Sequence, residues 1–233
     1  MPKCKLCTAD KKLLKSHIIP EFMYKSMYNK NKFLCASSIP GKKNTIKQKG
    51  EWERLLCDEC ELHISKYERY ASLFLKGGVE IGVIDHKDLI EINSIDYTKF
   101  KLFQLSVLWR ASISKRPIFK DVTLGRHEEV IREMLLNNDP GETNEYGCIM
   151  VATMHEGKHI DSLILQPELK RIDGQISYRF VFGGFWWLFF CSSHAPNKKL
   201  SNVFLQKDGI GYVFRKELNS AEHVVQFAAE VNI

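Results

Sequence analysis

Apolar residues of this 233-residue chain have helical spacing up to Gly77, and the character of the chain changes from that residue onward. Before it, apolar residues keep the three- and four-residue spacing of a helix face, and they are Leu62, Tyr67, Tyr70, Leu73 and Phe74. No proline interrupts this stretch, and the glycine pair that begins at Gly77 is a stop signal. The pattern predicts a helix over residues 58–76.

Two more helices and a set of strands are expected after Gly77. Residues 97–114 carry large apolar side chains at helical spacing and end before Pro117, which predicts an amphipathic helix. Residues 128–137 predict a second helix, closed by Asp139-Pro140-Gly141. Strand-like content then predicts strands over residues 146–153, 162–165, 176–182 and 185–190, a hairpin of 203–206 with 210–214, and a terminal helix over 221–231.

Two short apolar segments precede the first helix. Residues 14–19 and 54–56 are each long enough for a short strand, so the first third predicts strand, excursion, strand and helix. The expected class is α+β. It consists of an N-terminal module over residues 1–76 and an accessory α+β domain over residues 77–233, with helices at about 97–138, mostly antiparallel strands at about 146–214 and a C-terminal helix.

Two Cys-x-x-Cys pairs bracket the predicted strands, and they are Cys4 with Cys7 and Cys57 with Cys60. Each pair places two thiolates on one tight turn, and two such turns complete the four-sulfur shell that zinc prefers. Disulfides are the alternative, but seven is an odd number of cysteines, and the lysine-rich start lacks the apolar run of a secretory leader. A redox role suits one pair better than two. The spacing therefore predicts structural zinc, with Cys35, Cys148 and Cys191 as buried apolar residues.

The net charge of +6 is unevenly distributed. Residues 1–76 hold 16 basic against 8 acidic residues, a net +8, whereas residues 77–233 hold 18 against 20, a net −2. Lys42, Lys43, Lys47 and Lys49 fall in a stretch with almost no apolar content, which predicts an exposed loop or hairpin tip. Beside a zinc module, this loop and Arg54 are expected to bind nucleic-acid phosphates, and a merely solvated face is the alternative.

A membrane span is not expected. Residues 180–191 form the longest apolar stretch, which is shorter than the roughly 20 residues that cross a bilayer and is interrupted by Gly183-Gly184. A reducing cytoplasm would suit the free thiols. The aromatic side chains of this stretch alternate sides of a predicted strand, so they are expected in the core rather than stacked on bases.

The order of the motifs is informative. Cys4-x-x-Cys7, then Ser16-His17-Ile18-Ile19-Pro20, then Leu55-Leu56-Cys57-x-x-Cys60 before a helix resembles the cysteine-framed, zinc-binding branch of the HNH, or ββα-metal, endonuclease superfamily. The resemblance covers residues 4–68. It implies a β-hairpin and a helix pinned by structural Zn²⁺, with a strand histidine that takes a proton from the water attacking phosphorus. It also implies a catalytic Mg²⁺ or Mn²⁺ ion that stabilises the leaving oxygen.

Carried over by position, the resemblance makes His17 the general base and Glu61 the helix ligand of the catalytic ion, with Ser65 one turn further on. A neutral imidazole can accept a proton near neutral pH, and a carboxylate suits a hard cation. Glu21 is a further candidate ligand, for which ordinary surface charge is the favoured alternative.

Three positions depart from the family pattern. Ser16 stands where the family has an acidic or histidine ligand, Trp52 lies close to the position of its central asparagine, and Glu61 replaces its helix histidine. Two functions therefore stay open. The first is a divalent-metal-dependent endonuclease, expected to act on DNA rather than RNA, as in prokaryotic defence. The second is a catalytically silent zinc module that binds nucleic acid or a protein. The accessory domain is expected to shape substrate access, form a homodimer or dock a partner protein.

Overall fold

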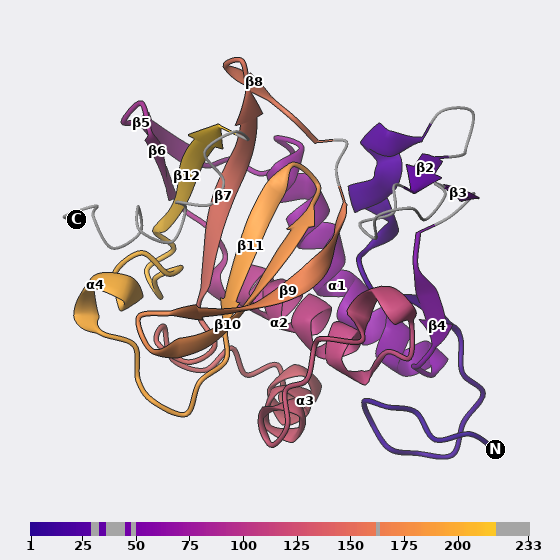
Figure 1. Ribbon diagram of the computed structural model, residues 1–233. Helices are drawn as coiled ribbons and strands as arrows, with labels where there is room; N and C mark the ends of the chain where they lie inside the picture. Colours follow the sequence, from indigo (N-terminus) through magenta and orange to yellow (C-terminus); the bar gives the residue numbers. More distant parts are fainter. Residues whose placement is uncertain (29–32, 36–44, 48–49, 162–163, 218–233) are drawn as a thin grey trace.

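The computed structural model describes residues 1–28, 33–35, 45–47, 50–161 and 164–217. The fold is α+β with a mostly antiparallel sheet, as the sequence predicts. The described residues before Asp58 lie to one side of this sheet, at the right of Figure 1, and the helices α1 (Asp58–Leu75) and α2 (Tyr97–Ile113) lie behind the sheet. The predicted helix at residue 221 onward falls outside the described residues.

The N-terminal part contains two strands followed by a helix. Strand β1 (Lys15–His17) pairs antiparallel with β4 (Trp52–Arg54), and α1 (Asp58–Leu75) follows at once. Between the two strands the chain forms a 3-10 helix, η1 (Glu21–Met27), and a second hairpin of β2 (Phe33–Cys35) with β3 (Thr45–Lys47). The predicted order of strand, excursion, strand and helix is confirmed.

The sheet begins with a hairpin for which the sequence gives no strong signal. Its strand order is β5 (Gly82–Asp85), β6 (Leu89–Asn93), β12 (Gly211–Glu217), β7 (Cys148–His155), β11 (Phe185–Phe190), β10 (Gln175–Phe182) and β9 (Leu165–Ile172). Strand β8 (Lys158–His159) also pairs with β7. Strands β12 and β7 run parallel, whereas the other described neighbours run antiparallel.

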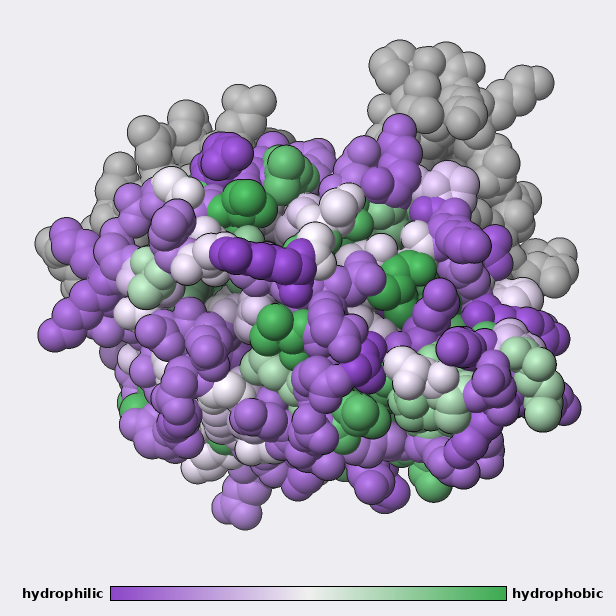
Figure 2. Space-filling view, turned by 90° about the horizontal axis from the view of Figure 1, so that it is seen from below, coloured by the Kyte–Doolittle hydropathy of each residue, from purple (hydrophilic) through white to green (hydrophobic). Residues whose placement is uncertain are grey.

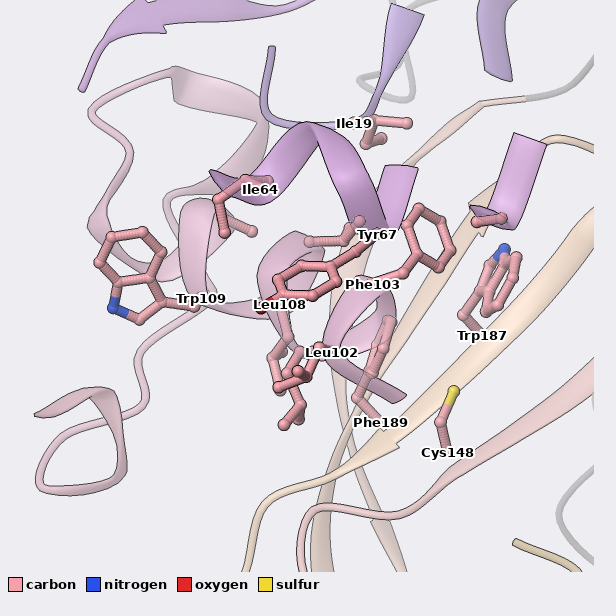
Figure 3. Packing of buried hydrophobic residues seen from close by; sticks show 14 of the residues in the cluster. Ile19, Ile64, Tyr67, Leu102, Phe103, Leu108, Trp109, Cys148, Trp187 and Phe189 are labelled. Carbon is pink, nitrogen blue, oxygen red and sulfur yellow. The ribbon is translucent and has the colours of Figure 1, made fainter. Parts of the chain in front are cut away.

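Helix α2 (Tyr97–Ile113) occupies the centre of the molecule. The expectation that it is amphipathic is wrong, because its residues from Phe100 to Ala111 are all buried. It contacts α1, α3 (His127–Asn137) and, through Phe100 and Phe103, Trp187 of the sheet, so it has no solvent-facing side in that stretch. Figure 3 shows Phe103 and Leu102 of α2 together with Trp187 and Phe189 of the sheet and Tyr67 of α1.

One apolar core joins the two predicted regions. The ring of Phe74 in α1 lies 4.7 Å from that of Phe100 in α2, which in turn lies 6.3 Å from Trp187 in β11. These centroid distances are in the range of favourable aromatic pairs. The division of the chain after residue 76 stays a prediction.

Of the apolar residues that predict α1, Leu62 and Leu73 are exposed, at 68% and 43%.

The opposite face of the sheet is also covered. Trp186, Leu188 and Phe190 alternate along β11 with the residues that face α2, and they pack against a short helix, α4 (Lys198–Ser201), and the residues after it. The predicted hairpin of 203–206 with 210–214 is wrong. Val203 and Phe204 are buried in a turn against this face, and only the segment after Gly209 continues as a strand, β12, between β6 and β7.

Figure 2 shows that one face of the molecule is largely hydrophilic, with apolar residues in small separate groups. Among the described helices, none combines the length and apolar composition that a bilayer crossing requires.

Candidate functional site

The four paired cysteines come from two turns that meet beside the β1–β4 hairpin. Cys4 and Cys7 lie on a tight turn in which the Thr8 amide donates to the Cys4 carbonyl at 2.9 Å. Cys57 is the N-terminal cap of α1, and Cys60 lies in the first turn of that helix. A backbone bond from Lys5 to the Leu55 carbonyl, 2.9 Å long, ties the first turn to the segment before the second.

The four sulfur atoms all lie within 4.8 Å of one another. The Cys7 and Cys57 sulfurs are 3.8 Å apart, far longer than a disulfide bond of about 2.05 Å. Four thiolates at about 2.3 Å from one zinc ion would be about 3.8 Å apart, which is the edge of the tetrahedron. In the described part of the chain, this is the one group of three or more histidine, cysteine or carboxylate ligands that converge. The donor set fits a closed, structural zinc site.

Electrostatics also favour a cation among the sulfurs. Burial raises the pKa of the Cys4 thiol, but the backbone N–H groups of Cys57, Cys7 and Leu6 outweigh burial and bring it to about 7. Burial and the neighbouring thiols raise the pKa of Cys60. Four thiolates cannot all ionise this close together unless a positive charge lies between them.

The remaining described cysteines match their predicted role. Cys148 and Cys191 are 5% and 3% exposed, and burial raises the pKa of Cys191 to about 12, so both are inert core residues. Cys35 lies in β2, whose side chains fall outside the described residues.

Beside the cysteines, Ser16 and Glu61 face each other. Ser16 is fully buried in β1, and its hydroxyl donates to the Glu61 carboxylate in the first turn of α1. The same hydroxyl accepts a hydrogen bond from the Leu56 amide at 3.3 Å. Burial raises the pKa of Glu61, although the Ser16 bond and the charge of Arg110 act in the opposite direction. The strand residue before the histidine and the helix residue after the second cysteine pair are therefore neighbours.

His17 lies on the opposite side of β1 from Ser16, because successive strand residues alternate sides. Its side chain is 27% exposed, and its Nε2 atom is 2.8 Å from Glu21 Oε2. The Tyr28 hydroxyl donates to the other oxygen of Glu21 at 2.5 Å. Burial and the Glu21 charge raise the pKa of Tyr28 to about 12, so Tyr28 remains a donor at neutral pH. Glu21 therefore contacts the predicted base, which neither interpretation of its sequence position anticipates.

A basic and aromatic surface surrounds His17. Trp52 is the cross-strand partner of His17, and Lys15 is the partner of Arg54, so all four project from the same face of the hairpin. The Lys15 ammonium lies 4.4 Å from the centre of the Trp52 ring, and the Arg116 guanidinium lies 5.4 Å from it. In the family resemblance, Trp52 is noted only because it lies close to the position of the family's central asparagine. The pairing register is what places it beside the histidine.

Other predicted site residues are placed differently. Ser65 is exposed, and its hydroxyl donates to the Leu62 carbonyl at 2.8 Å, so it is turned toward its own helix. Arg54 donates to the Leu13 carbonyl at 2.9 Å and is exposed. Lys42, Lys43 and Lys49 lie outside the described residues, as does the side chain of Lys47.

Arg110 of α2 is a neighbour of the site that sequence reasoning misses. Its guanidinium is buried and donates to the carbonyl oxygen of His17 at 2.5 Å. The signal in the sequence is weak, because it is one charged residue between Trp109 and Ala111 in a mostly apolar helix.

Comparison of the chain with family models, with curated proteins and with solved structures found no match. Functional conclusions therefore rest on the chemistry of the residues themselves.

Proposed function

We propose that this protein is an endonuclease with an HNH-like module, in which zinc is structural and His17 acts as the general base on a nucleic-acid phosphodiester. The observation that carries the proposal is the contact between Ser16 and Glu61 in a β-hairpin and helix that four converging cysteines clip together. It places the strand residue before His17 against the helix residue after Cys60, which is the arrangement that the family resemblance requires.

Zinc would be held by Cys4, Cys7, Cys57 and Cys60 and would supply no chemistry of its own, since four sulfurs leave no open position for substrate. Its role would be to fix the start of α1 against the N-terminal turn. The divalent ion, Mg²⁺ or Mn²⁺, would be bound through Glu61 and would supply positive charge at the phosphate. Because Mg²⁺ retains several water molecules, a single carboxylate with a neighbouring hydroxyl is a sufficient anchor.

His17 would take a proton from the attacking water. The imidazole is partly exposed, as a base that meets substrate must be, and the Glu21 carboxylate at Nε2 fixes the orientation of the ring. An imidazolium formed during the reaction would be stabilised by the negative charge of Glu21. The cations Lys15, Arg54 and Arg116 lie on the same surface and would bind the phosphate backbone.

The experiment is a cleavage assay on plasmid, single-stranded DNA and RNA, with Mg²⁺ or Mn²⁺ added. The informative variants are His17→Ala and Glu61→Gln, and the matched controls are His155→Ala and Glu59→Gln, which remove an exposed histidine and an exposed carboxylate of the same helix turn. Cleavage that falls at least about 100-fold in the first two variants and is retained in the controls supports the proposal. Cleavage that persists in His17→Ala contradicts it.

A catalytically silent nucleic-acid-binding module is the second candidate. It is favoured by the state of Glu61, whose carboxylate is partly buried and already accepts the Ser16 hydroxyl at one oxygen, so less of the carboxylate is open to an ion. This candidate predicts binding without cleavage on every substrate, with an affinity that falls as salt rises. Binding that is unaffected by Lys15→Ala and Arg116→Ala together would exclude the hairpin face as the binding surface.

A further inference from the structure

The end of helix α2 and the residues that follow it hold both strands of the β1–β4 hairpin. Arg110 Nη1 donates to the carbonyl oxygen of His17 in β1 at 2.5 Å. On β4, Glu53 accepts bonds of 3.0 Å from the Ser114 hydroxyl and 2.8 Å from the Lys115 amide. The zinc-framed hairpin is therefore fixed by a segment that lies outside residues 1–76.

The guanidinium of Arg110 is fixed from several directions. Its Nη2 atom pairs with Glu68 Oε1 of α1 at 2.7 Å, and its side chain is 2% exposed. Within its own helix, Nε donates to the Ser106 carbonyl at 3.1 Å and Nη2 to the Ser106 hydroxyl at 3.3 Å. A planar guanidinium with donors at both ends can bridge a carbonyl and a carboxylate at once, which a lysine ammonium on its flexible stem cannot reproduce.

The Arg110–Glu68 pair joins a buried guanidinium to a carboxylate that is 25% exposed. Hydrophobic residues of similar volume are often as stabilising or more so, because they avoid the desolvation of two charges. A hydrophobic side chain in place of Arg110 could not donate a hydrogen bond to the carbonyl oxygen of His17. Arg110 itself cannot touch substrate, because almost none of its surface is accessible.

We propose that Arg110 is a positioning residue that holds the backbone of His17, and with it the imidazole, in the orientation used at the site. The catalytic meaning of this role rests on the proposed nuclease function. The positional claim does not, because it concerns where the His17 ring lies.

The test uses the full, zinc-loaded chain and three variants. Arg110→Met removes the anchor and leaves Glu68 unpaired. The double variant Glu68→Leu/Arg110→Met removes both charges, so no carboxylate is left without its partner, but the His17 carbonyl still lacks the Arg110 donor. Arg132→Met is the matched control, because Arg132 is also mostly buried at 12% exposure and donates to a backbone carbonyl, that of Leu6.

The readouts are the urea midpoint, the NMR signals of labelled histidine side chains and the nuclease rate. We expect Arg110→Met to lose stability and the double variant to recover most of it. In the double variant the His17 signals, identified by their absence in His17→Gln, should remain shifted from wild type. In the double variant, the rate constant kcat should remain about 10- to 100-fold below that of wild type, while the affinity for nucleic acid stays within about twofold of the wild-type value. Arg132→Met should leave the His17 signals in place.

Return of the His17 signals to their wild-type positions in the double variant would overturn the proposal, since Glu68 and Arg110 would then be only a structural pair. If the wild-type protein cleaves nothing, the nuclease function fails and the NMR result alone decides the role of Arg110. If His17 signals shift while kcat is unchanged in an active enzyme, Arg110 does not position the base for catalysis.

Discussion

Substitution of Ser16 by alanine tests how the hairpin and α1 are joined. The change removes a fully buried hydroxyl that donates to Glu61 and accepts from the Leu56 amide. A hydrogen bond to a charged group contributes about 1.5–3 kcal/mol, and a buried amide left without an acceptor costs about 1–3 kcal/mol. Allowing for relaxation, we expect the free energy of unfolding to fall by about 2–4 kcal/mol. For a chain of this length, 3 kcal/mol corresponds to roughly 6–12 °C in Tm.

The assay is urea denaturation of Ser16→Ala and of Ser65→Ala at about pH 5 and about pH 8. Ser65 is exposed and bonds only within its own helix among the contacts that the structure describes, so Ser65→Ala should lie within about 0.5 kcal/mol of wild type. The two serines belong to the same residue type but differ in burial. The comparison therefore isolates the buried hydroxyl.

The pH dependence gives a second, independent check. The pKa of Glu61 is raised by burial, so in the window above its usual range the folded protein binds more protons than the unfolded chain, and stability falls as pH rises. Loss of the Ser16 donor raises this pKa further and widens the window. The deficit of Ser16→Ala should therefore be larger at the higher pH. A deficit equal to that of Ser65→Ala, or one that does not grow with pH, would refute the reasoning.

Two other predictions concern the core. Trp187→Ala empties a fully buried site that packs on Phe103 and Phe182, so it should lower the free energy of unfolding in urea by about 3–5 kcal/mol. Leu169→Ala, at a side chain 53% exposed, should lower it by less than about 0.5 kcal/mol. Equal losses in the two variants would contradict the packing. Burial lowers the pKa of Lys101 to about 8 from the usual 10.5, so between these two pH values the unfolded chain binds more protons than the folded protein. The free energy of unfolding should therefore rise with pH in this window, and Lys101→Met should remove the rise. An unchanged pH profile in the variant would be inconsistent with a buried ammonium.

Local spacing is what the sequence reveals well. The cysteine pairs and the helix after Cys57 are predictable because each depends on residues a few positions apart, and the structure confirms that the four sulfurs converge. The order of strand, excursion, strand and helix follows from the same signals. Residues 82–93, in contrast, carry the charged run Asp85-His86-Lys87-Asp88 at the end of β5 and in the turn that follows, and β5 is exposed throughout. An exposed edge strand such as β5 lacks the apolar alternation on which strand prediction depends.

Contacts between distant residues are what the sequence conceals. Arg110 is 93 positions from His17, and nothing in the apolar pattern of α2 indicates that its charge meets a strand carbonyl. Trp52 could be placed beside His17 only once the register of β1 with β4 was known. The predicted hairpin after residue 203 fails for a similar reason. Its Asp208-Gly209 turn is present, but the segment before it is needed to cover the sheet.

The central claim is that four thiolates hold one zinc ion and thereby shape the surface that carries His17. Its most direct test is the zinc content of the purified full chain by elemental analysis, for wild type, Cys57→Ser and Cys148→Ala. We predict one zinc ion per chain in wild type and in Cys148→Ala, whose thiol lies in the core, and loss of zinc with loss of folding in Cys57→Ser. Wild-type protein without zinc after preparation in zinc-containing medium, or Cys57→Ser that keeps its zinc, would contradict the account.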